Sequence, residues 1–377
     1  MTEENPDLLP EGLEDRLPRE AAAATRATRA IQDVMHGHGY NRVAPPMIEF
    51  ERSLAARMTG ISTRRMFRFV DPSSLKMMAL RSDFTPQIGR IAETRLAHAP
   101  RPLRLCYAGQ VLTVRADGLD PARERLQCGA ELIGADSVAA ASEIVGIAIE
   151  ALQAAGGRGI SVDFTLPDLV DTLAAQAMPL GADQIEGVRR ELDTKDAGGL
   201  VAAGGEAYLP LLYATGDFAS AIERLAQIDA GIGARGALAG RIAALREIAA
   251  SVGGAARLTL DPTERHGFEY QSWLGFTLYA DGARGALGRG GTYQIAATRE
   301  VATGFSLYPD ALIAQSAAAE AAEDRLFLPL GHNRDAAARL RAIGWRTLAA
   351  LSAQDSAATL GCTHLLEGDT PVDLPQK

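Results

Sequence analysis

The stretch RERLQCGAELIG (123–134) governs the interpretation of this chain, because its residues alternate between two chemical kinds. Successive side chains of a β-strand point to opposite faces of the sheet, so residues two apart share a face. One face of this stretch is apolar: Leu126, Cys128, Ala130 and Leu132. The other is polar around one glycine: Arg125, Gln127, Gly129 and Glu131. The pattern predicts a strand with one face in the core.

The polar face of this strand suits a small charged ligand. Gln127 and Glu131 are four residues apart, about 13 Å at ~3.3 Å per residue, and the small Gly129 between them leaves room for an amino acid. A carboxylate is an apt partner for an ammonium group, because charge-assisted hydrogen bonds are the strong ones. A solvated sheet face is the alternative, and this strand alone does not separate the two interpretations.

Two upstream segments belong with this strand. The turn-rich ADGLDPA (116–122) predicts an antiparallel hairpin over residues 102–133, and its first arm contains Tyr107. Further upstream, LRSDFTPQIGR (80–90) supplies Asp83 and Thr85, whose acidic and hydroxyl groups suit the same ligand. Asp83 and Thr85 equally suit a turn cap.

Helical periodicity marks several other regions. A helix is predicted from Arg19 to Met35 and another from Ser137 to Ala155, with Ser137 as N-cap and with Glu143 and Glu150 on one solvated face. Residues 165–251 are rich in Ala and Leu at helical spacing, which predicts a helical insertion or a separate small domain. A linker at 316–325 precedes a tail that alternates strand, helix, strand, short helix and strand. That rhythm predicts a small α/β domain from residue 325.

Composition excludes several classes of function. The net charge of −9 over 377 residues provides no global positive field, which counts against nucleic acid as the main partner. Cys106, Cys128 and Cys362 are far apart and form no CxxC pair, so no metal site is predicted. The acidic N-terminus and the lack of a long apolar run favour a cytoplasmic protein with no membrane partner and with free thiols.

The order of the motifs resembles the catalytic domain of histidyl-tRNA synthetase over residues 9–313, apart from the helical insertion. The segments that carry this resemblance are LPEG (9–12), GYNRVAPPMIEF (39–50), LRSDFTPQIGR, RLCYAGQVLTV (104–114), QCGAELIG (127–134), ERHGFEYQSWLGF (264–276), GGTYQ (290–294) and ATGFSLYPDAL (302–312). The runs RLCYAG and QCGAELIG are also similar to those of the ATP phosphoribosyltransferase regulatory subunits, which look like this synthetase without its aminoacylation function.

The resemblance implies an α+β fold with a class II synthetase-like antiparallel sheet flanked by helices. It divides the chain into a synthetase-like domain over 1–315, with the helical insertion at about 165–251, and a small C-terminal α/β domain over 325–377. The Pro45–Pro46 segment would be a homodimer-interface motif.

Departures from the synthetase pattern imply that the chain has no catalytic residues of its own. Thr113 and Ala311 stand where the family carries two ATP-contacting arginines. His266 and Thr292 replace two further arginines. Triphosphate chemistry requires fixed cations to stabilise developing charge, so these losses should abolish adenylation. Arg115 and Arg265 lie close in sequence, but a shift of one or two residues on a strand redirects the side chain.

The histidine pocket of the family is better retained. Six positions match it or differ conservatively: Asp83, Thr85, Tyr107, Gln127, Glu131 and Tyr270. Gln271 stands where a second tyrosine of the imidazole-recognising loop is expected. Histidine binding at these residues is a hypothesis, and the interface between subunits is the alternative place for an effector site.

The function implied by the resemblance is regulatory. The chain would assemble in a hetero-oligomer with the short-form catalytic subunit of ATP phosphoribosyltransferase and make it responsive to histidine, with no cofactor of its own. Two other readings stay open. An active histidyl-tRNA synthetase would need the missing arginines. A stand-alone histidine sensor or tRNA-binding module would ignore the transferase, and the acidic balance counts against tRNA.

Overall fold

The computed structural model describes residues 8–55, 66–115, 121–231, 236–265, 271–295, 298–319 and 324–375. The chain divides into two compact units, Met1–Ala318 and Ala319–Lys377. In the described ranges, no helix is both long enough and apolar enough to span a bilayer.

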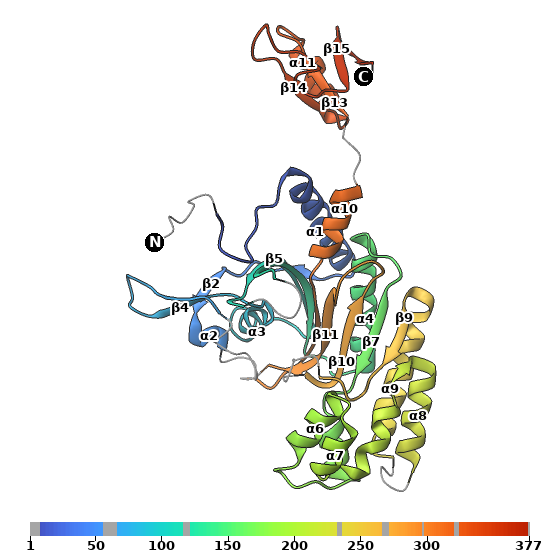
Figure 1. The fold of residues 1–377 in the computed structure, drawn as a ribbon. Coiled ribbons are helices and arrows are strands. Elements are labelled where there is room, and N and C mark those ends of the chain that lie inside the picture. Colours follow the sequence, from blue (N-terminus) through green and yellow to red (C-terminus); the bar gives the residue numbers. More distant parts are fainter. Residues whose placement is uncertain are drawn as a thin grey trace, which may run out of the picture. The chain divides into compact units, whose positions relative to one another are not determined.

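A nine-stranded sheet forms the centre of the first unit, in the order β1-β5-β6-β12-β11-β10-β7-β9-β8 (Figure 1). Its strands are β1 (Asn41–Arg42), β5 (Leu103–Leu112), β6 (Glu124–Ile133), β7 (Ser161–Thr165), β8 (Gly216–Asp217), β9 (Arg257–Leu260), β10 (Gln271–Tyr279), β11 (Gly288–Gln294) and β12 (Val301–Leu307). Pairing is antiparallel from β5 through β7, as the fold-class prediction requires. The predicted hairpin is confirmed, with Leu103 opposite Ile133 and Leu112 opposite Glu124. Most of its predicted turn lies outside the described residues.

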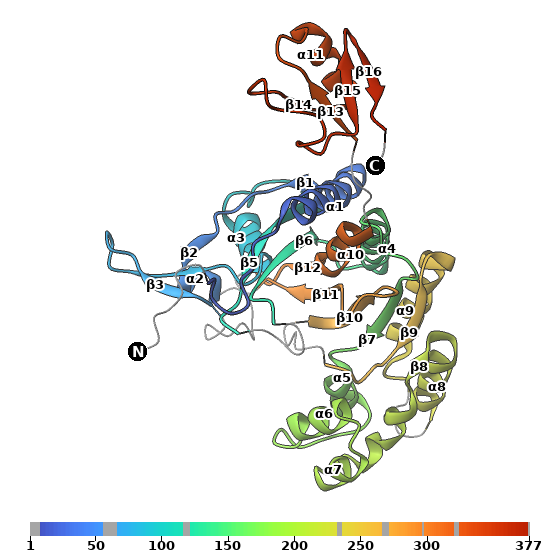
Figure 2. The ribbon, with the colours of Figure 1, turned by 45° about the horizontal axis from the view of Figure 1, so that its top comes forward.

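One face of this sheet is covered by α1 (Pro18–Gly37), α4 (Val138–Ala154) and α9 (Ala239–Val252) (Figures 1 and 2). Both predicted helices, α1 and α4, are confirmed. The Ser137 side chain accepts a hydrogen bond from the Ala140 N–H at 3.2 Å, as an N-cap should. The prediction of a solvated Glu143 is wrong, because Arg104 from β5 donates two hydrogen bonds of 2.8 Å to its carboxylate.

The opposite face of the sheet carries α3 (Thr85–Thr94), whose Ile88 and Ala92 are fully buried. Phe84, just before this helix, stacks on Tyr107 of β5 with ring centroids 4.6 Å apart. Tyr293 of β11 belongs to the same buried cluster. Helix α3 therefore brings the motif at residues 80–90 onto the polar face of β6.

Short helices make up most of the region between β7 and β9. They are α5 (Leu169–Gln176), α6 (Ile185–Asp193), α7 (Ala197–Ala202), the 3-10 helix η2 (Glu206–Tyr213) and α8 (Phe218–Ala230). With α9 and the 3-10 turn η3 (Gly253–Ala255), they account for the helical periodicity of the sequence. Their apolar sides join the core behind the large sheet.

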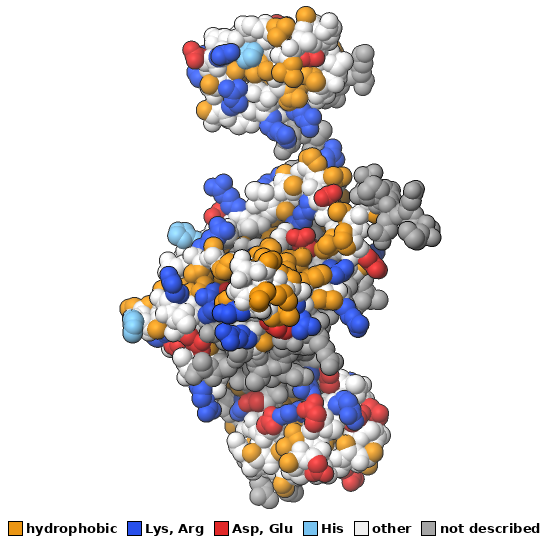
Figure 3. All heavy atoms as spheres, turned by 90° about the vertical axis from the view of Figure 1, so that its left-hand side faces the viewer, with side chains coloured by type: hydrophobic (Ala, Val, Ile, Leu, Met, Phe, Trp, Pro, Cys, Tyr) orange, Lys and Arg blue, Asp and Glu red, His pale blue; other side chains and the backbone are white. Residues whose placement is uncertain are grey.

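A separate three-stranded sheet, in the order β2-β4-β3, follows the Pro45–Pro46 segment. It comprises β2 (Ile48–Phe50), β3 (Arg68–Val70) and β4 (Met77–Leu80), next to the short helix α2 (Glu51–Ala55). This region exposes a group of large apolar side chains: Met47, Ile48, Phe50, Phe69, Val70, Leu75 and Met77. We call it the apolar sheet. Figure 3, which views the side of the molecule where β2 and β4 lie, shows hydrophobic side chains gathered beside basic ones.

Helix α10 (Asp310–Ala319) follows β12, and the second unit then begins. The second unit has a four-stranded sheet in the order β14-β13-β15-β16, formed by β13 (Arg325–Leu328), β14 (Arg346–Ala349), β15 (His364–Glu367) and β16 (Thr370–Asp373), with α11 (Arg334–Ala342).

The predicted short helix between β14 and β15 is wrong, since residues 351–361 form turns. The Asp355 carboxylate accepts hydrogen bonds from the N–H groups of Leu351 and Ser352 at 2.7 and 2.9 Å. Such local side-chain bonds compete with helical ones.

Candidate functional site

Glu131, near the end of β6, is the most deeply placed carboxyl of the polar face, with 1% of its surface exposed. The hydroxyl of Thr85 donates to its Oε1 at 3.1 Å, and the hydroxyl of Tyr293 donates to its Oε2 at 2.9 Å. Burial raises the pKa of Glu131 to about 8, and the nearby charge of Asp83 adds to this rise. Hydrogen bonds from Tyr293 and Thr85 lower the pKa and so oppose it in part. The site therefore contains a carboxyl group whose charge changes near neutral pH.

Gln127, four residues earlier on β6, is completely buried and fully used by its neighbours. Its Oε1 accepts from the N–H of Phe84 at 3.1 Å, and its Nε2 donates to Asp83 Oδ1 at 3.0 Å and to Ser306 Oγ at 2.7 Å. Asp83 Oδ1 also accepts from the N–H of Thr85 at 2.8 Å. Asp83 is thus both the turn cap and a member of the polar network, so the two interpretations hold together.

Tyr107 of β5 fills the space that the sequence offered to a ligand. A Cβ atom built on Gly129 would meet the Tyr107 hydroxyl at 2.4 Å, so the phenol lies directly over that glycine. The hydroxyl is 3.0 Å from Ser306 Oγ. The expectation that a ligand lies over Gly129, between Gln127 and Glu131, is therefore wrong, because Gly129 instead makes room for Tyr107.

The open space lies one strand further across the sheet, in a small cavity that is partly open to solvent. Its lining includes one carboxyl, one guanidinium and several hydroxyl groups: Thr85, Glu131, Gln271, Arg289, Gly290, Gly291, Tyr293, Gly304, Phe305 and Ser306. We call this cavity the sheet pocket.

Two glycines form the floor of the sheet pocket. A Cβ on Gly304 would lie 1.7 Å from Glu131 Oε2, and a Cβ on Gly291 would lie 2.9 Å from the Gln271 amide. Gly304 and Gly291 are paired across β12 and β11. The Glu131 carboxyl and the Gln271 amide therefore approach one another over adjacent glycines, and Gln271 is fixed by donating to Gly290 O at 2.9 Å.

The structure brings together five of the six predicted pocket residues. Thr85 and Glu131 line the sheet pocket, while Asp83, Tyr107 and Gln127 belong to the hydrogen-bonded network behind it. Tyr270 lies outside the described residues. Burial raises the pKa of Tyr107 well above its ordinary value, so its hydroxyl keeps its proton as a donor.

Sequence reasoning missed three residues that line the sheet pocket: Arg289, Tyr293 and Ser306. A signal for two of them was present. Period-two alternation through β11 puts Arg289, Gly291 and Tyr293 on one face, as it did for β6. The sequence alone does not show that β6 pairs with β12 and that β12 pairs with β11. This pairing places the polar face of β11 beside Glu131.

Four positions stand where the resemblance places arginines of the family, and the structure describes three of them. None of these three residues has a basic side chain. Thr113 is half-buried beyond the end of β5, and Ala311 packs against the core from α10. The hydroxyl of Thr292 is 2.8 Å from that of Ser272 and accepts from the N–H of Leu274. His266, the fourth position, lies outside the described residues.

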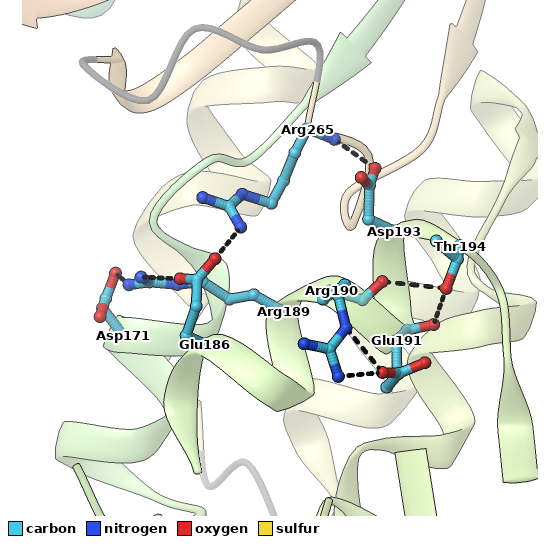
Figure 4. Close-up of polar contacts among 8 residues, drawn as sticks. All are labelled: Asp171, Glu186, Arg189, Arg190, Glu191, Asp193, Thr194 and Arg265. Atoms are coloured by element: carbon cyan, nitrogen blue, oxygen red, sulfur yellow. Dashed lines mark hydrogen bonds and ion pairs between the residues drawn. The ribbon is translucent and has the colours of Figure 1, made fainter. Parts of the chain in front are cut away.

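The arginines that were candidates to compensate are placed elsewhere. Arg115 is exposed. Arg265 donates from Nη1 to Glu186 of α6 at 2.7 Å, and its backbone N–H donates to Asp193 at 2.8 Å, as Figure 4 shows. Arg189 binds the other oxygen of Glu186 and also pairs with Asp171. These contacts, which we call the α6 ionic cluster, direct Arg265 toward the helical region.

No three His, Cys, Asp or Glu side chains converge as metal ligands in the part of the chain that the structure describes. The cysteines at 106, 128 and 362 are buried free thiols. Burial raises the pKa of Cys106 to about 11 and that of Cys128 to about 12. These two thiols therefore stay protonated and behave as small apolar side chains.

Comparison with known proteins gives consistent results. The family model of histidyl-tRNA synthetase matches residues 12–312. An ATP phosphoribosyltransferase regulatory subunit from Paramagnetospirillum magneticum is 42% identical over 383 residues, covering 99% of this chain and 100% of that protein. One from Rhodospirillum rubrum is 40% identical, with 96% of each chain covered.

Two solved structures share the fold. An ATP phosphoribosyltransferase regulatory subunit/histidyl-tRNA synthetase from Bacillus halodurans superposes with a TM-score of 0.81 at 22% identity, covering 96% of this chain and 97% of that one. Histidyl-tRNA synthetase from Nostoc has a TM-score of 0.77 at 15% identity, covering 95% and 90%.

Proposed function

This chain belongs to the histidyl-tRNA synthetase family and, within it, to the ATP phosphoribosyltransferase regulatory subunits, and from that premise we propose how it works. Its role in histidine biosynthesis is regulatory. It binds the short-form catalytic subunit in a hetero-oligomer, enables that subunit to join ATP and phosphoribosyl pyrophosphate, and makes the reaction responsive to histidine. The catalytic residues belong to the partner, and this chain needs no cofactor.

The observation that carries this proposal is the contrast between the two halves of the site. The amino-acid half keeps a buried carboxyl, Glu131, held by hydroxyl groups beside an open pocket. The nucleotide half has Thr113 and Ala311 where phosphate-binding cations would be needed. Adenylation depends on preorganised positive charge at the phosphate. A fold that retains the first half and lacks the second is suited to sensing an amino acid without activating it.

Histidine suits the sheet pocket for a chemical reason. Its imidazole and ammonium groups donate hydrogen bonds, and the buried Glu131 carboxyl accepts them. Regulation requires histidine to bind one state of the assembly more tightly than another. The effector would then change the activity of the partner without touching its substrates.

A reconstitution experiment tests the regulatory role. The full chain is mixed with a short-form catalytic subunit, and formation of phosphoribosyl-ATP is followed with and without histidine. We expect a complex on size-exclusion chromatography, activity that depends on this chain, and a rate that changes with histidine. If the proteins elute separately and the rate ignores this chain, the stand-alone sensor becomes the better description.

A second experiment separates this proposal from a synthetase. The isolated chain is assayed for histidine-dependent exchange between ATP and pyrophosphate, with an authentic histidyl-tRNA synthetase as positive control. We expect no exchange above background. Turnover would mean that the missing arginines are replaced by other groups and that the chain is an enzyme.

The apolar sheet supports a homodimer of this chain within the assembly. Its first exposed side chains, Met47 and Ile48, follow the Pro45–Pro46 segment directly, and exposed apolar patches mark interaction sites. We expect Phe69→Glu to lower the mass measured by light scattering to that of one chain. Ile343→Glu, at an exposed apolar residue of the second unit, is the matched control and should leave the mass unchanged. A dimer that survives Phe69→Glu would place the interface elsewhere.

The remaining features of the proposal follow from composition. The acidic balance disfavours nucleic acid as a partner, and a biosynthetic subunit with free thiols suits the cytoplasm.

A further inference from the structure

The sheet pocket has little free space in this structure, although the backbone beneath it leaves room for more. Its free volume is about 20 Å³, which is comparable to one water molecule. An amino acid does not fit into such a volume. A pocket that takes the proposed effector therefore has to lose a group that fills it now, and the side chains over its floor show which group that is.

Three glycines on neighbouring strands form a trough under the pocket, which we call the glycine trough. Gly304 of β12 is opposite Gly291 of β11, which is opposite Gly275 of β10. The trough begins at Glu131 of β6, opposite Gly304. It ends at Thr165 of β7, opposite Gly275. Because three consecutive strands have no side chain here, the trough spans about 10 Å between its outer glycines, at ~4.8 Å per strand. This span is long enough for an amino acid.

The side chain of Gln271, at the start of β10, fills the glycine trough. A Cβ atom on Gly275 would lie 2.5 Å from Gln271 Oε1, and a Cβ atom on Gly291 would lie 2.9 Å from Gln271 Nε2. The pairing of β10 with β11 is irregular between Gln271 and Gly275, and irregularities of this kind change the direction of a side chain. The Gln271 amide therefore lies directly over both glycines.

The Gln271 amide is held weakly in comparison with the other glutamine of the site. Its Nε2 donates one hydrogen bond to a described residue, to the carbonyl oxygen of Gly290 at 2.9 Å, and its side chain is half-buried. Gln127 is fully buried and makes three hydrogen bonds, to Phe84, Asp83 and Ser306. Gln271 can leave its position when one hydrogen bond breaks and water solvates the amide, whereas Gln127 is fixed.

We propose that Gln271 is a displaceable plug of the sheet pocket: its side chain occupies the glycine trough in the free protein and leaves when the effector binds. The carbonyl oxygen of Gly290 then accepts a hydrogen bond from the imidazole or the ammonium group of the ligand, in place of the Gln271 amide. The ligand lies along the trough, with its donors directed to Glu131 and Gly290. This inference rests on the proposed function, since it names how the proposed histidine pocket opens.

The first test shortens the plug. Isothermal titration calorimetry with L-histidine on the full chain compares the wild type, Gln271→Ala and the matched control Gln294→Ala, at an exposed glutamine of β11. We expect Gln271→Ala to bind histidine about 3- to 10-fold more tightly than the wild type, because no hydrogen bond has to be broken to open the trough. Gln294→Ala should bind as the wild type does. Equal or weaker binding by Gln271→Ala overturns the plug.

A crystal structure of the wild-type protein with histidine is the second test, and it does not depend on the variant. We expect the ligand over Gly291 and Gly275, with the Gln271 amide no longer bonded to Gly290. Histidine bound in the sheet pocket while Gln271 stays over these glycines would overturn the inference and leave the proposed function standing. If neither the wild type nor Gln271→Ala binds histidine, the proposed histidine pocket fails and the inference fails with it.

Discussion

Glu131 and Glu186 are both carboxyl groups at the centre of a polar cluster, and they differ in what surrounds them. Glu131 is 1% exposed and accepts hydrogen bonds from the hydroxyls of Thr85 and Tyr293. The Glu186 side chain is 65% exposed and binds the guanidinium groups of Arg265 and Arg189. Burial raises the pKa of Glu131 to about 8, whereas the hydrogen bond from Arg265 lowers the pKa of Glu186.

The two clusters differ in whether the negative charge of the carboxyl group is balanced within the protein. The charge of Glu186 is already balanced by fixed cations, so the α6 ionic cluster connects helix α6 to the loop before residue 266 and needs nothing more. The hydroxyl groups around Glu131 satisfy its hydrogen bonds without supplying positive charge. In a buried site that charge must be balanced by a proton or by a cationic group that enters the pocket. The proposed histidine pocket rests on this difference, because in the described part of the chain Glu131 has no fixed cation beside it with which a ligand would have to compete.

The largest loss of histidine binding is expected from Gly304→Ala. This change displaces the Glu131 carboxyl group without removing any polar group from the pocket. The added Cβ would lie 1.7 Å from Glu131 Oε2 and 2.8 Å from the carbonyl oxygen of Ala130, so the carboxyl group must move out of its position. Overpacking of this kind costs about 1–3 kcal/mol of folding stability. We expect histidine binding, measured by calorimetry, to be lost, together with a lower midpoint of unfolding.

Gly146→Ala is the matched control for this change. Gly146 lies inside α4, and a Cβ there meets nothing within 4 Å. Replacing glycine by alanine inside a helix stabilises it by about 0.5–1 kcal/mol. Histidine binding should be unaffected. Normal affinity in Gly304→Ala would show that Glu131 does not need its position over the glycine floor.

A smaller loss of histidine affinity is expected from Glu131→Gln. The effect of this change on folding stability should depend on pH. The pKa of Glu131 is raised from 4.5 to about 8 in the folded state, so the folded state holds the proton more tightly than the unfolded state does. This contribution to stability is complete below pH 4.5 and is lost as pH rises through 8. The variant should therefore gain stability relative to the wild type across this window, by on the order of a few kcal/mol. Histidine affinity should fall by roughly 1–3 kcal/mol.

Glu143→Gln should show the opposite pH dependence. Hydrogen bonds from Arg104 lower the pKa of Glu143, so its contribution is present at neutral pH and disappears as the pH falls through its folded-state pKa. Urea titrations of the wild type, Glu131→Gln and Glu143→Gln at several pH values measure whether each variant gains or loses stability relative to the wild type as the pH rises. A flat difference between Glu131→Gln and the wild type would mean that folding does not raise the pKa of Glu131.

How much of this the sequence could predict depends on how local each feature is. Helix α4 with its Ser137 cap, helix α1, and the hairpin of β5 and β6 follow from short-range periodicity and turn residues, and the structure has all of them. Residues 351–361 were misassigned because side chains such as Asp355 bond to nearby backbone N–H groups and outweigh the helical tendency of the alanines.

The candidate site could be predicted only in part, because it depends on contacts between residues that are far apart in the sequence. Period two on a single strand was enough to group Gln127 with Glu131. It could not show that Tyr107 from the neighbouring strand occupies the space over Gly129. Arg289 is more than 150 residues from Glu131 in sequence and joins it only through the pairing of β6, β12 and β11. Sheet register, a property of the whole fold, decides which residues face the ligand.

The smallest change in stability is expected from Glu186→Gln, which tests the exposed carboxylate of the comparison. The change removes the charge that Arg265 and Arg189 share, but Asp171 still pairs with Arg189 and Asp193 still accepts from the backbone N–H of Arg265. Exposed ion pairs contribute about 0–1 kcal/mol, and their contribution is screened at ~1 M salt. We therefore expect a small loss of stability in urea titrations at low salt, a smaller loss at high salt, and unchanged histidine affinity.

Glu223→Gln, which breaks the exposed ion pair with Arg246, is the matched control for a surface pair in the helical region. The two variants should behave alike, because in both a solvent-exposed carboxylate loses a partner that water can replace. If Glu186→Gln alone alters histidine affinity, the α6 ionic cluster acts on the sheet pocket. In that case the two clusters would form one cooperative unit, and the contrast between a ligand-binding and a purely structural carboxylate would no longer hold.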